Sequence, residues 1–288
     1  MTIGQDIINL YDSFTHGVID RRTFMERLGR MAGGTAAATA ALALLTNDYA
    51  RATVVAEDDA RLTVAMATIG GGDGALKAYV ARTKGTATQG AVIVIHENRG
   101  LNAHIKDVAR RVALEGFAAI APDLLSSAGG TPSDEDKARD MIGALDPGQT
   151  TAALLAAVGY AKARPDGNGK VGAVGFCWGG GLANQLAVHA PDLAAAVAYY
   201  GSQPASADVP KIKAALLLHY AGKDDRIGAG IPAYEAALKA AGTDYKMYIY
   251  EGAQHAFNND TNAARYDKTA AELAWGRTID FLKAKLAG

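Results

Sequence analysis

The chain has 288 residues, 49% of them hydrophobic and 20% charged, so it can bury a large core and resembles an ordinary globular protein. Its formal net charge is -1 and no basic stripe alternates with aromatic residues, which argues against nucleic acid as a partner. The single cysteine excludes an internal disulfide and does not identify the redox compartment.

The N-terminal segment, residues 1–52, differs from the rest and has two interpretations. A pair of arginines, Arg21-Arg22, precedes an apolar, alanine-rich run at residues 31–45, and Ala50-Arg51-Ala52 has the small-x-small form of a cleavage site. This layout favours a twin-arginine export signal and a periplasmic or secreted protein. The run is too short and too rich in alanine, glycine and threonine for a stable membrane span.

The alternative is a helical cap on the main domain of a cytoplasmic protein. Apolar residues recur at helical spacing on both sides of His16-Gly17: Ile8, Leu10, Tyr11 and Phe14 before it, and Phe24, Leu28 and Met31 after it. The pattern predicts two amphipathic helices, and the alanine run would form a third.

Three further histidines, His16, His104 and His189, have no catalytic or metal-binding motif around them. We therefore expect them to be surface or helix-capping residues.

Residues 53–288 predict one α/β domain, because strand and helix patterns alternate without an internal repeat or linker. Strands are predicted at 62–67 and 76–81, as a hairpin around residues 70–74, and at 91–95, 117–121, 171–176, 194–200, 214–220 and 245–250. Helices are predicted at 105–115, 154–163, 180–189, 231–241 and 270–286, with a polar loop through 133–136. Such alternation predicts a mostly parallel sheet with helices on both faces.

The strand at 171–176 runs into Gly175-Phe176-Cys177-Trp178-Gly179, a Gly-x-Cys-x-Gly pattern that is typical of a nucleophile elbow with a thiol in place of serine. A sharp turn strains its central residue and needs neighbours without side chains. It would expose Cys177, aim the N–H of Trp178 at a developing oxyanion, and place the thiolate at a helix N-terminus. The alternative is a buried structural cysteine before a glycine-rich turn.

A base and an acid follow in the order expected after such an elbow. The strand at 245–250 leads to His255, which would accept the thiol proton, and the strand at 214–220 leads to Asp224, which would orient the imidazole. Asp224 is preferred over Asp225 because of its register in the loop. The alternative for both carboxylates is a solvated acidic turn. His219 lies inside a predicted strand and is expected in the core.

The loop His96-Glu97-Asn98-Arg99-Gly100 follows the strand at 91–95, where hydrolases with such an elbow place a second oxyanion donor. We expect the N–H of Asn98 to be that donor. His96-Glu97 lacks the second histidine of a helical zinc motif, and there is no further cysteine, so neither a metal nor a cofactor is expected.

Together these motifs resemble the dienelactone hydrolase family of α/β-hydrolases, from about residue 61 to the C-terminus. The likeness rests on residues 96–100, 175–180, Tyr199-Tyr200-Gly201, the Asp224 loop and residues 252–257. It implies an α/β-hydrolase fold and a triad of Cys177, Asp224 and His255. It also implies that Glu97 contacts the resting thiol and gives way when substrate binds; the alternative for Glu97 is a surface pair with Arg99.

The resemblance implies a cofactor-independent hydrolase of small carboxylic esters or lactones, of the carboxymethylenebutenolidase class, with Arg99 and Phe257 as expected substrate contacts. Dienelactone-cleaving members are similar in placing an arginine shortly after the catalytic histidine to hold a substrate carboxylate. Here Phe257-Asn258-Asn259-Asp260 follows His255, Arg265 lies too far along, and Arg139 is only in roughly the right stretch. The class of chemistry therefore transfers better than the substrate does.

Two other functions remain open for the same residues. An acyltransferase or thioesterase would use the same triad on a different acceptor or acyl donor. A noncatalytic, hydrolase-like protein could instead use Cys177 to sense oxidants, since an exposed thiol of low pKa is oxidisable.

Overall fold

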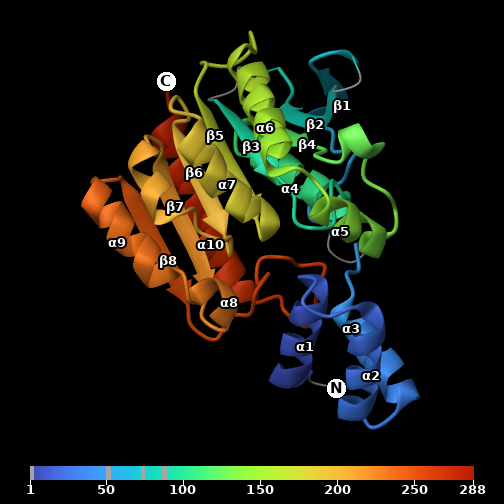
Figure 1. Ribbon diagram of the computed structural model, residues 1–288. Helices are drawn as coiled ribbons and strands as arrows, with labels where there is room; N and C mark the ends of the chain where they lie inside the picture. Colours follow the sequence, from blue (N-terminus) through green and yellow to red (C-terminus); the bar gives the residue numbers. More distant parts are fainter. Residues whose placement is uncertain (1–2, 50–52, 73–74, 86–89) are drawn as a thin grey trace.

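Eight strands form one sheet in the part of the chain that the computed structural model describes, residues 3–49, 53–72, 75–85 and 90–288 (Figure 1). They are β1 (Leu62–Ile69), β2 (Leu76–Thr83), β3 (Ala91–Ile95), β4 (Ala118–Pro122), β5 (Val171–Phe176), β6 (Ala195–Tyr199), β7 (Ala215–Ala221) and β8 (Tyr245–Tyr250). Their order is β1-β2-β4-β3-β5-β6-β7-β8, and only the β1–β2 and β2–β4 pairs are antiparallel. The prediction of a mostly parallel sheet is confirmed.

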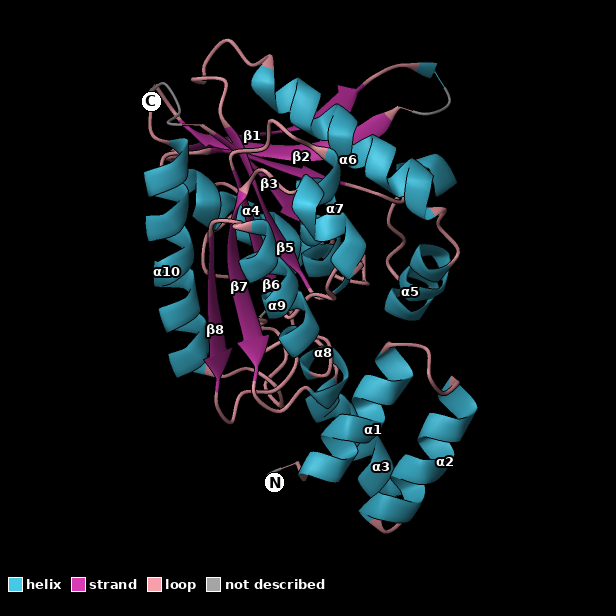
Figure 2. Ribbon diagram, turned by 60° about the vertical axis from the view of Figure 1, so that its left-hand side comes forward, coloured by secondary structure: helices cyan, strands magenta, loops and turns pink. Residues whose placement is uncertain are grey.

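Helices cover both faces of this sheet, and every residue of the five strands β3 to β7 is buried. The helices α4 (Ala103–Leu114) and α10 (Lys268–Leu286) share one hydrophobic core with the sheet. The helices α6 (Pro147–Lys162), α7 (Trp178–His189) and α9 (Ile231–Ala241) share the other (Figure 2). Burial on both faces explains why these strands read as continuous apolar runs rather than as alternating ones.

Differences from the predicted elements are mostly shifts of one or a few residues at their ends. The helix α5 (Glu135–Gly143) is an exception, because it begins inside the predicted polar loop. Asp134 caps it by accepting a hydrogen bond from the N–H of Lys137 at 2.9 Å, which turns an acidic loop into a helix start. The short helices α8 (Asp225–Gly228), η2 (Ser126–Ala128) and η3 (Ser206–Lys211) were not predicted. The predicted cleavage site Ala50-Arg51-Ala52 and the turn residues Asp73-Gly74 lie outside the described residues.

Residues 3–49 form three helices, α1 (Gln5–Thr15), α2 (Arg21–Ala32) and α3 (Thr35–Leu45), which we call the N-terminal cap. They enclose a small core of their own, made of Leu10, Tyr11, Phe14, Phe24, Leu28, Ala38, Ala41 and Leu45. Within the described residues, none of the helices alone has the length and apolar character needed to cross a membrane. The pair α2 and α3 meets these criteria together, but it is bent by 111°.

The N-terminal cap lies beyond the carboxyl ends of the parallel strands, beside the loops that leave them (Figures 1 and 2). Polar contacts join the two parts: Arg265 Nη1 to Asp12 Oδ1 at 2.9 Å, Asn98 Nδ2 to the carbonyl of Thr15 at 2.7 Å, and Arg21 Nη1 to Asp136 Oδ2 at 2.6 Å. The Arg139 guanidinium also lies 4.6 Å from the centre of the Phe14 ring. The N-terminal cap therefore meets the edge of the sheet where side chains of several strand-end loops converge.

Candidate active site

The turn between β5 and α7 holds Cys177 in a strained backbone conformation, with φ 54° and ψ -116°. A side chain at either flanking glycine would collide with backbone. A Cβ on Gly175 would lie 1.9 Å from the carbonyl oxygen of Gly179, and a Cβ on Gly179 would lie 2.4 Å from that of His96. The absence of side chains at the two glycines therefore allows the sharp turn, as the elbow pattern predicts, and the thiol lies at the tip of that turn.

Asp224 and His255 lie together beside this turn. His255 Nδ1 is 2.5 Å from Asp224 Oδ2, while Asp224 Oδ1 accepts a hydrogen bond from the N–H of Ile227 at 3.2 Å. Because a carboxylate only accepts, His255 donates through Nδ1 and its Nε2 faces the sulfur side. Among the described residues this buried Nε2 has no hydrogen-bond partner. Asp225 is exposed, so the structure places Asp224, the preferred residue, against the imidazole.

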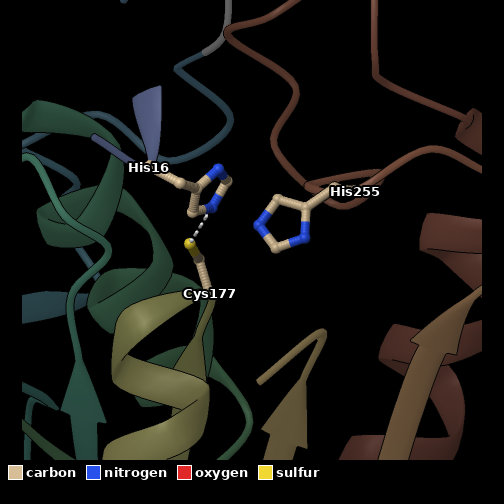
Figure 3. Close-up of side chains that lie close together, drawn as sticks. All are labelled: His16, Cys177 and His255. Carbon is tan, nitrogen blue, oxygen red and sulfur yellow. Dashed lines mark hydrogen bonds between the residues drawn. The ribbon is translucent and has the colours of Figure 1, made fainter. Parts of the chain in front are cut away.

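His16 of the N-terminal cap also reaches the sulfur. Its Nε2 is 3.5 Å from Cys177 Sγ, and its ring meets the His255 ring edge to face at a centroid distance of 4.8 Å (Figure 3). Arg226 donates to the same Nε2 at 3.0 Å. The expectation of a surface or capping residue is therefore incomplete: His16 does end α1, but it also lies in the site. Nothing near His16 in the sequence signals this contact, which depends on how the cap docks.

The electrostatics of the site favour a thiolate. Burial raises the pKa of the Cys177 thiol, but the charge of the nearby His255 and the hydrogen bond with His16 outweigh it and lower that pKa to about 6. Burial lowers the pKa of His255, whereas the charge of Cys177 and the bond to Asp224 raise it to about 10. Burial likewise raises the pKa of Asp224, and its contacts with His255 lower it below the usual range. The three groups therefore stabilise one another's charges.

A cavity of about 500 Å³ opens beside Cys177, between the N-terminal cap and the α/β domain. Both predicted oxyanion donors, Asn98 and Trp178, line it together with Cys177. Its other lining residues include Thr15, His16, Arg139, Ile142, Tyr200, Arg226 and Ile227. The sequence analysis missed His16, Arg226 and Tyr200 as site neighbours. His16 comes from a segment without a catalytic motif, whereas Arg226 and Tyr200 stand in the Asp224 loop and the Tyr199-Tyr200-Gly201 motif without a role of their own that the sequence indicates.

Glu97 does not make the predicted contact with the resting thiol. Its Oε2 accepts a hydrogen bond from Asn259 Nδ2 at 2.7 Å, and its Oε1 is buried without a partner among the described residues. The recorded hydrogen-bond partner of the sulfur is His16 instead. Glu97 does lie near the thiol, since it lines a small cavity of about 20 Å³ together with Cys177, His255 and Arg265.

The two expected substrate contacts, Arg99 and Phe257, do not line the large cavity, although Arg99 lines the small cavity beside Cys177. Arg99 is buried and donates to the backbone carbonyl of Glu135 at 3.1 Å, so it holds the start of α5 rather than pairing with Glu97 or facing the large cavity. Phe257 is fully buried and packs on Tyr200 at a centroid distance of 5.4 Å, because the loop after His255 turns back into the core. It therefore supports the wall of the cavity from behind.

The expected location is confirmed for His219 but not for His104. His219 lies in the core, as expected, with its ring nitrogens 3.1 Å from Thr278 Oγ1 and 2.8 Å from the Tyr250 hydroxyl. His104, expected at the surface, is buried instead, with Nδ1 3.2 Å from Asp260 Oδ1.

His16, Cys177 and His255 bring three donor atoms within 4.8 Å of one another, which is the spacing of a metal-binding cluster. The Arg226 guanidinium occupies the same face of His16 Nε2 and adds a positive charge there. Since a cation would have to displace that charge, we do not identify these residues as metal ligands.

The sequence matches two family models and several known proteins. Residues 76–286 match the model described as "Dienelactone hydrolase family", and residues 2–33 match one described as "YqhI-like". A protein of Saccharolobus solfataricus is 37% identical in an alignment of 229 positions, and the match covers 67% of this chain and 88% of that protein. One of Methylorubrum extorquens is 32% identical over 260 residues, 84% and 88% of the two chains. Both relatives are named "Putative carboxymethylenebutenolidase".

A solved structure, that of a dienelactone hydrolase-like promiscuous phosphotriesterase from metagenomic libraries, matches this fold with a TM-score of 0.69 and 25% identity. The match covers 79% of this chain and 100% of that one. The predicted α/β-hydrolase fold and the family resemblance are both confirmed.

Replacement of Gly175 by alanine should destabilise the protein, because the new Cβ would lie 1.9 Å from the Gly179 carbonyl oxygen and the backbone must move. We expect a loss of about 3 kcal/mol in the free energy of unfolding, measured by urea titration. Gly159→Ala in α6 is the matched control, since nothing lies within 4 Å of its Cβ and alanine favours a helix. Equal stability of the two variants would contradict the close approach.

Alkylation of Cys177 by iodoacetamide should reach half of its plateau rate near pH 6, because the thiolate is the reactive form and its pKa is lowered to about 6. Below that pH the thiol is protonated and the rate falls. Intact-protein mass reports this one cysteine directly. His255→Ala should move the midpoint upward, since it removes a positive charge beside the sulfur. A wild-type midpoint near 9, the ordinary thiol value, would contradict this account.

Proposed function

Because the chain belongs to the dienelactone hydrolase family, we propose that it hydrolyses small carboxylic esters or lactones through a thioester on Cys177. Family membership makes it a hydrolase of the carboxylic ester class. The observation that carries the cysteine mechanism is the contact of one strained, low-pKa thiol with two imidazoles beside an open cavity. These are the parts that nucleophilic catalysis needs: a nucleophile, a base and a group that orients the base.

In the first half of the proposed reaction, the thiol proton passes to an adjacent imidazole and the sulfur attacks the carbonyl carbon. The N–H groups of Trp178 and Asn98 stabilise the resulting oxyanion. The C–O bond then breaks, the imidazole returns its proton to the departing alcohol, and a thioester on Cys177 remains. For a lactone, the alcohol stays attached to the acyl group.

In the second half, water attacks the thioester with His255 as the base. Acylation removes the negative charge of the sulfur, which is one of the causes that raise the pKa of His255. The ring therefore releases its Nε2 proton to solvent once the thioester has formed, and the neutral ring can then accept a proton from water. Asp224 fixes the tautomer through Nδ1 and stabilises the imidazolium that results. The C–S bond breaks, and the acid leaves.

The cavity indicates the size of the substrate. A volume of about 500 Å³ accommodates a small ester, and Ile142, Trp178 and Ile227 give it apolar walls near the sulfur. Phe257 and Asn258 stand where dienelactone-cleaving relatives carry an arginine. We therefore propose that neutral esters and lactones with small acyl groups are accepted without a free carboxylate.

Cys177→Ala should abolish hydrolysis of a p-nitrophenyl ester of a short acyl group, since the thioester then has no sulfur to form on. His255→Ala should slow turnover by about a hundredfold or more, because the loss of a positioned base slows proton transfer. In that variant the acyl-enzyme should accumulate, visible as an added acyl mass on the intact protein. Unchanged hydrolysis in either variant would remove the proposed residues from the mechanism.

Asp224→Asn and Asp225→Asn form a matched pair, with the same change on neighbouring residues. Asp224→Asn should lower kcat by about a hundredfold or more, because the amide no longer fixes the tautomer or stabilises the imidazolium of His255. Asp225→Asn should stay within about twofold of wild type, since that side chain is exposed. A larger loss in the second variant would make Asp225 the partner of the imidazole in solution.

A further inference from the structure

We propose that His16 of the N-terminal cap is a catalytic residue: it accepts the thiol proton of Cys177 and returns it to the leaving group. This inference rests on the proposed cysteine mechanism and adds to it a residue from outside the α/β domain. It identifies which of the two imidazoles serves the first half of the reaction.

The hydrogen bonds of His16 define its tautomer. Nδ1 is 2.8 Å from the carbonyl oxygen of Asp12, which can only accept, so Nδ1 carries a hydrogen. In the neutral ring, Nε2 then has one lone pair, and this nitrogen lies 3.5 Å from Cys177 Sγ (Figure 3) and 3.0 Å from Arg226 Nη2. The thiol is therefore next to a base that is already held in the tautomer needed to receive a proton.

Two helix ends favour that proton transfer. Cys177 precedes the first residue of α7, where the partial positive charge of the helix N-terminus stabilises a thiolate. His16 is the C-cap of α1, and its ring is bonded to a carbonyl of the last turn, where the partial negative charge stabilises an imidazolium. The N-terminus of α7 thus favours the thiolate of Cys177, and the C-terminus of α1 favours the imidazolium of His16 that contacts it.

Charged groups from several elements face this pair. Arg226 of α8 donates to Nε2 at 3.0 Å and opposes a positive ring, so its exposed side chain has to move aside when that nitrogen takes up the thiol proton. Arg265 is compensated by its ion pair with Asp12 at 2.9 Å. Glu97, with one buried oxygen without a partner among the described residues, lines the same small cavity as His16 and favours a positive charge there. His255 carries Asp224 on its far nitrogen.

The position of His16 relative to the cavity sets its part in the reaction. His16 lines the 500 Å³ cavity in which a substrate would lie, whereas the lining of that cavity does not include His255. His255 is 2% exposed and lines the small cavity of about 20 Å³, which shares Cys177 and His16 with the large one. A leaving group that departs into the large cavity therefore meets His16 first, and the buried His255 remains for the water of the second step.

The step balances as follows. Before substrate is attacked, the S–H proton has already moved to His16 Nε2, because the lowered pKa of Cys177 favours the thiolate. The thiolate forms the C–S bond, the tetrahedral intermediate breaks its C–O bond, and His16 gives that proton to the alkoxide. His16 is then neutral, and the proton that water supplies in the second half restores the thiolate–imidazolium pair, so no oxidant, reductant or further reactant is needed.

A functional His16 requires the N-terminal segment to stay on the protein. Cleavage after Ala52 would remove His16 together with the cap contacts made through Asp12 and Thr15. The proposal therefore requires a retained helical cap rather than a cleaved export signal.

The test uses His16→Asn in the full chain, because asparagine suits a helix end and keeps a polar side chain there. Val18→Ala, at a position 70% exposed on the same cap, is the control. Hydrolysis is measured for two esters of one acyl group, a p-nitrophenyl ester and an ethyl ester. Nitrophenolate leaves without a proton, whereas ethoxide needs one. His16→Asn should therefore lose about a hundredfold on the ethyl ester and only a few-fold on the nitrophenyl ester.

A second readout follows the sulfur itself. The iodoacetamide midpoint of Cys177 should rise in His16→Asn, because one of the hydrogen bonds that lower the thiol pKa is lost. His16→Gln should behave in the same way, which guards against a folding defect peculiar to one variant; urea titration confirms that both are folded.

An equal loss on the two esters, or an unchanged midpoint with wild-type rates, would overturn the role of His16. If Cys177→Ala remains inactive in that case, the proposed function stands without His16. If Cys177→Ala is active, the proposed function itself fails.

Discussion

The site depends on the close contact of the β5–α7 turn with the backbone around it. Gly175 approaches the carbonyl of Gly179, and Gly179 approaches that of His96, so the turn has no room for side chains and Cys177 takes a left-handed conformation. This packing fixes the sulfur relative to the Asn98 loop on one side and to the helix N-terminus on the other. The imidazoles and the oxyanion donors are useful only because the sulfur is held in one place.

Much of the fold was predictable because its signals are local. Strands buried on both faces appear as short apolar runs, and the Gly-x-Cys-x-Gly spacing marks the elbow without knowledge of any tertiary contact. The choice of Asp224 over Asp225 also followed from register within one loop. These features are encoded within a few neighbouring residues, so a single sequence is enough to read them.

The remaining features depend on docking between distant segments. His16 and Cys177 are 161 residues apart, and the amphipathic pattern around His16 describes only the core of the cap, not the surface on which it rests. Glu97 was expected at the sulfur but is held by Asn259, from the loop after His255. Phe257 reads as a loop residue beside the site, yet the chain turns inward and buries it under Tyr200. The direction of such side chains is set by tertiary packing, and no periodic pattern in the sequence indicates it.

The residues that line the large cavity come from two different parts of the chain, the α/β domain and the N-terminal cap. Cys177 and Tyr200 follow strands of the sheet and Trp178 begins α7, whereas Thr15 and His16 stand at the end of the first helix of the cap. Mutations that reshape the cap core, around Phe24 and Leu28, can therefore alter which molecules fit without disturbing the elbow that reacts with them. The range of accepted substrates can thus change through the packing of the cap while the turn that holds Cys177 keeps its geometry.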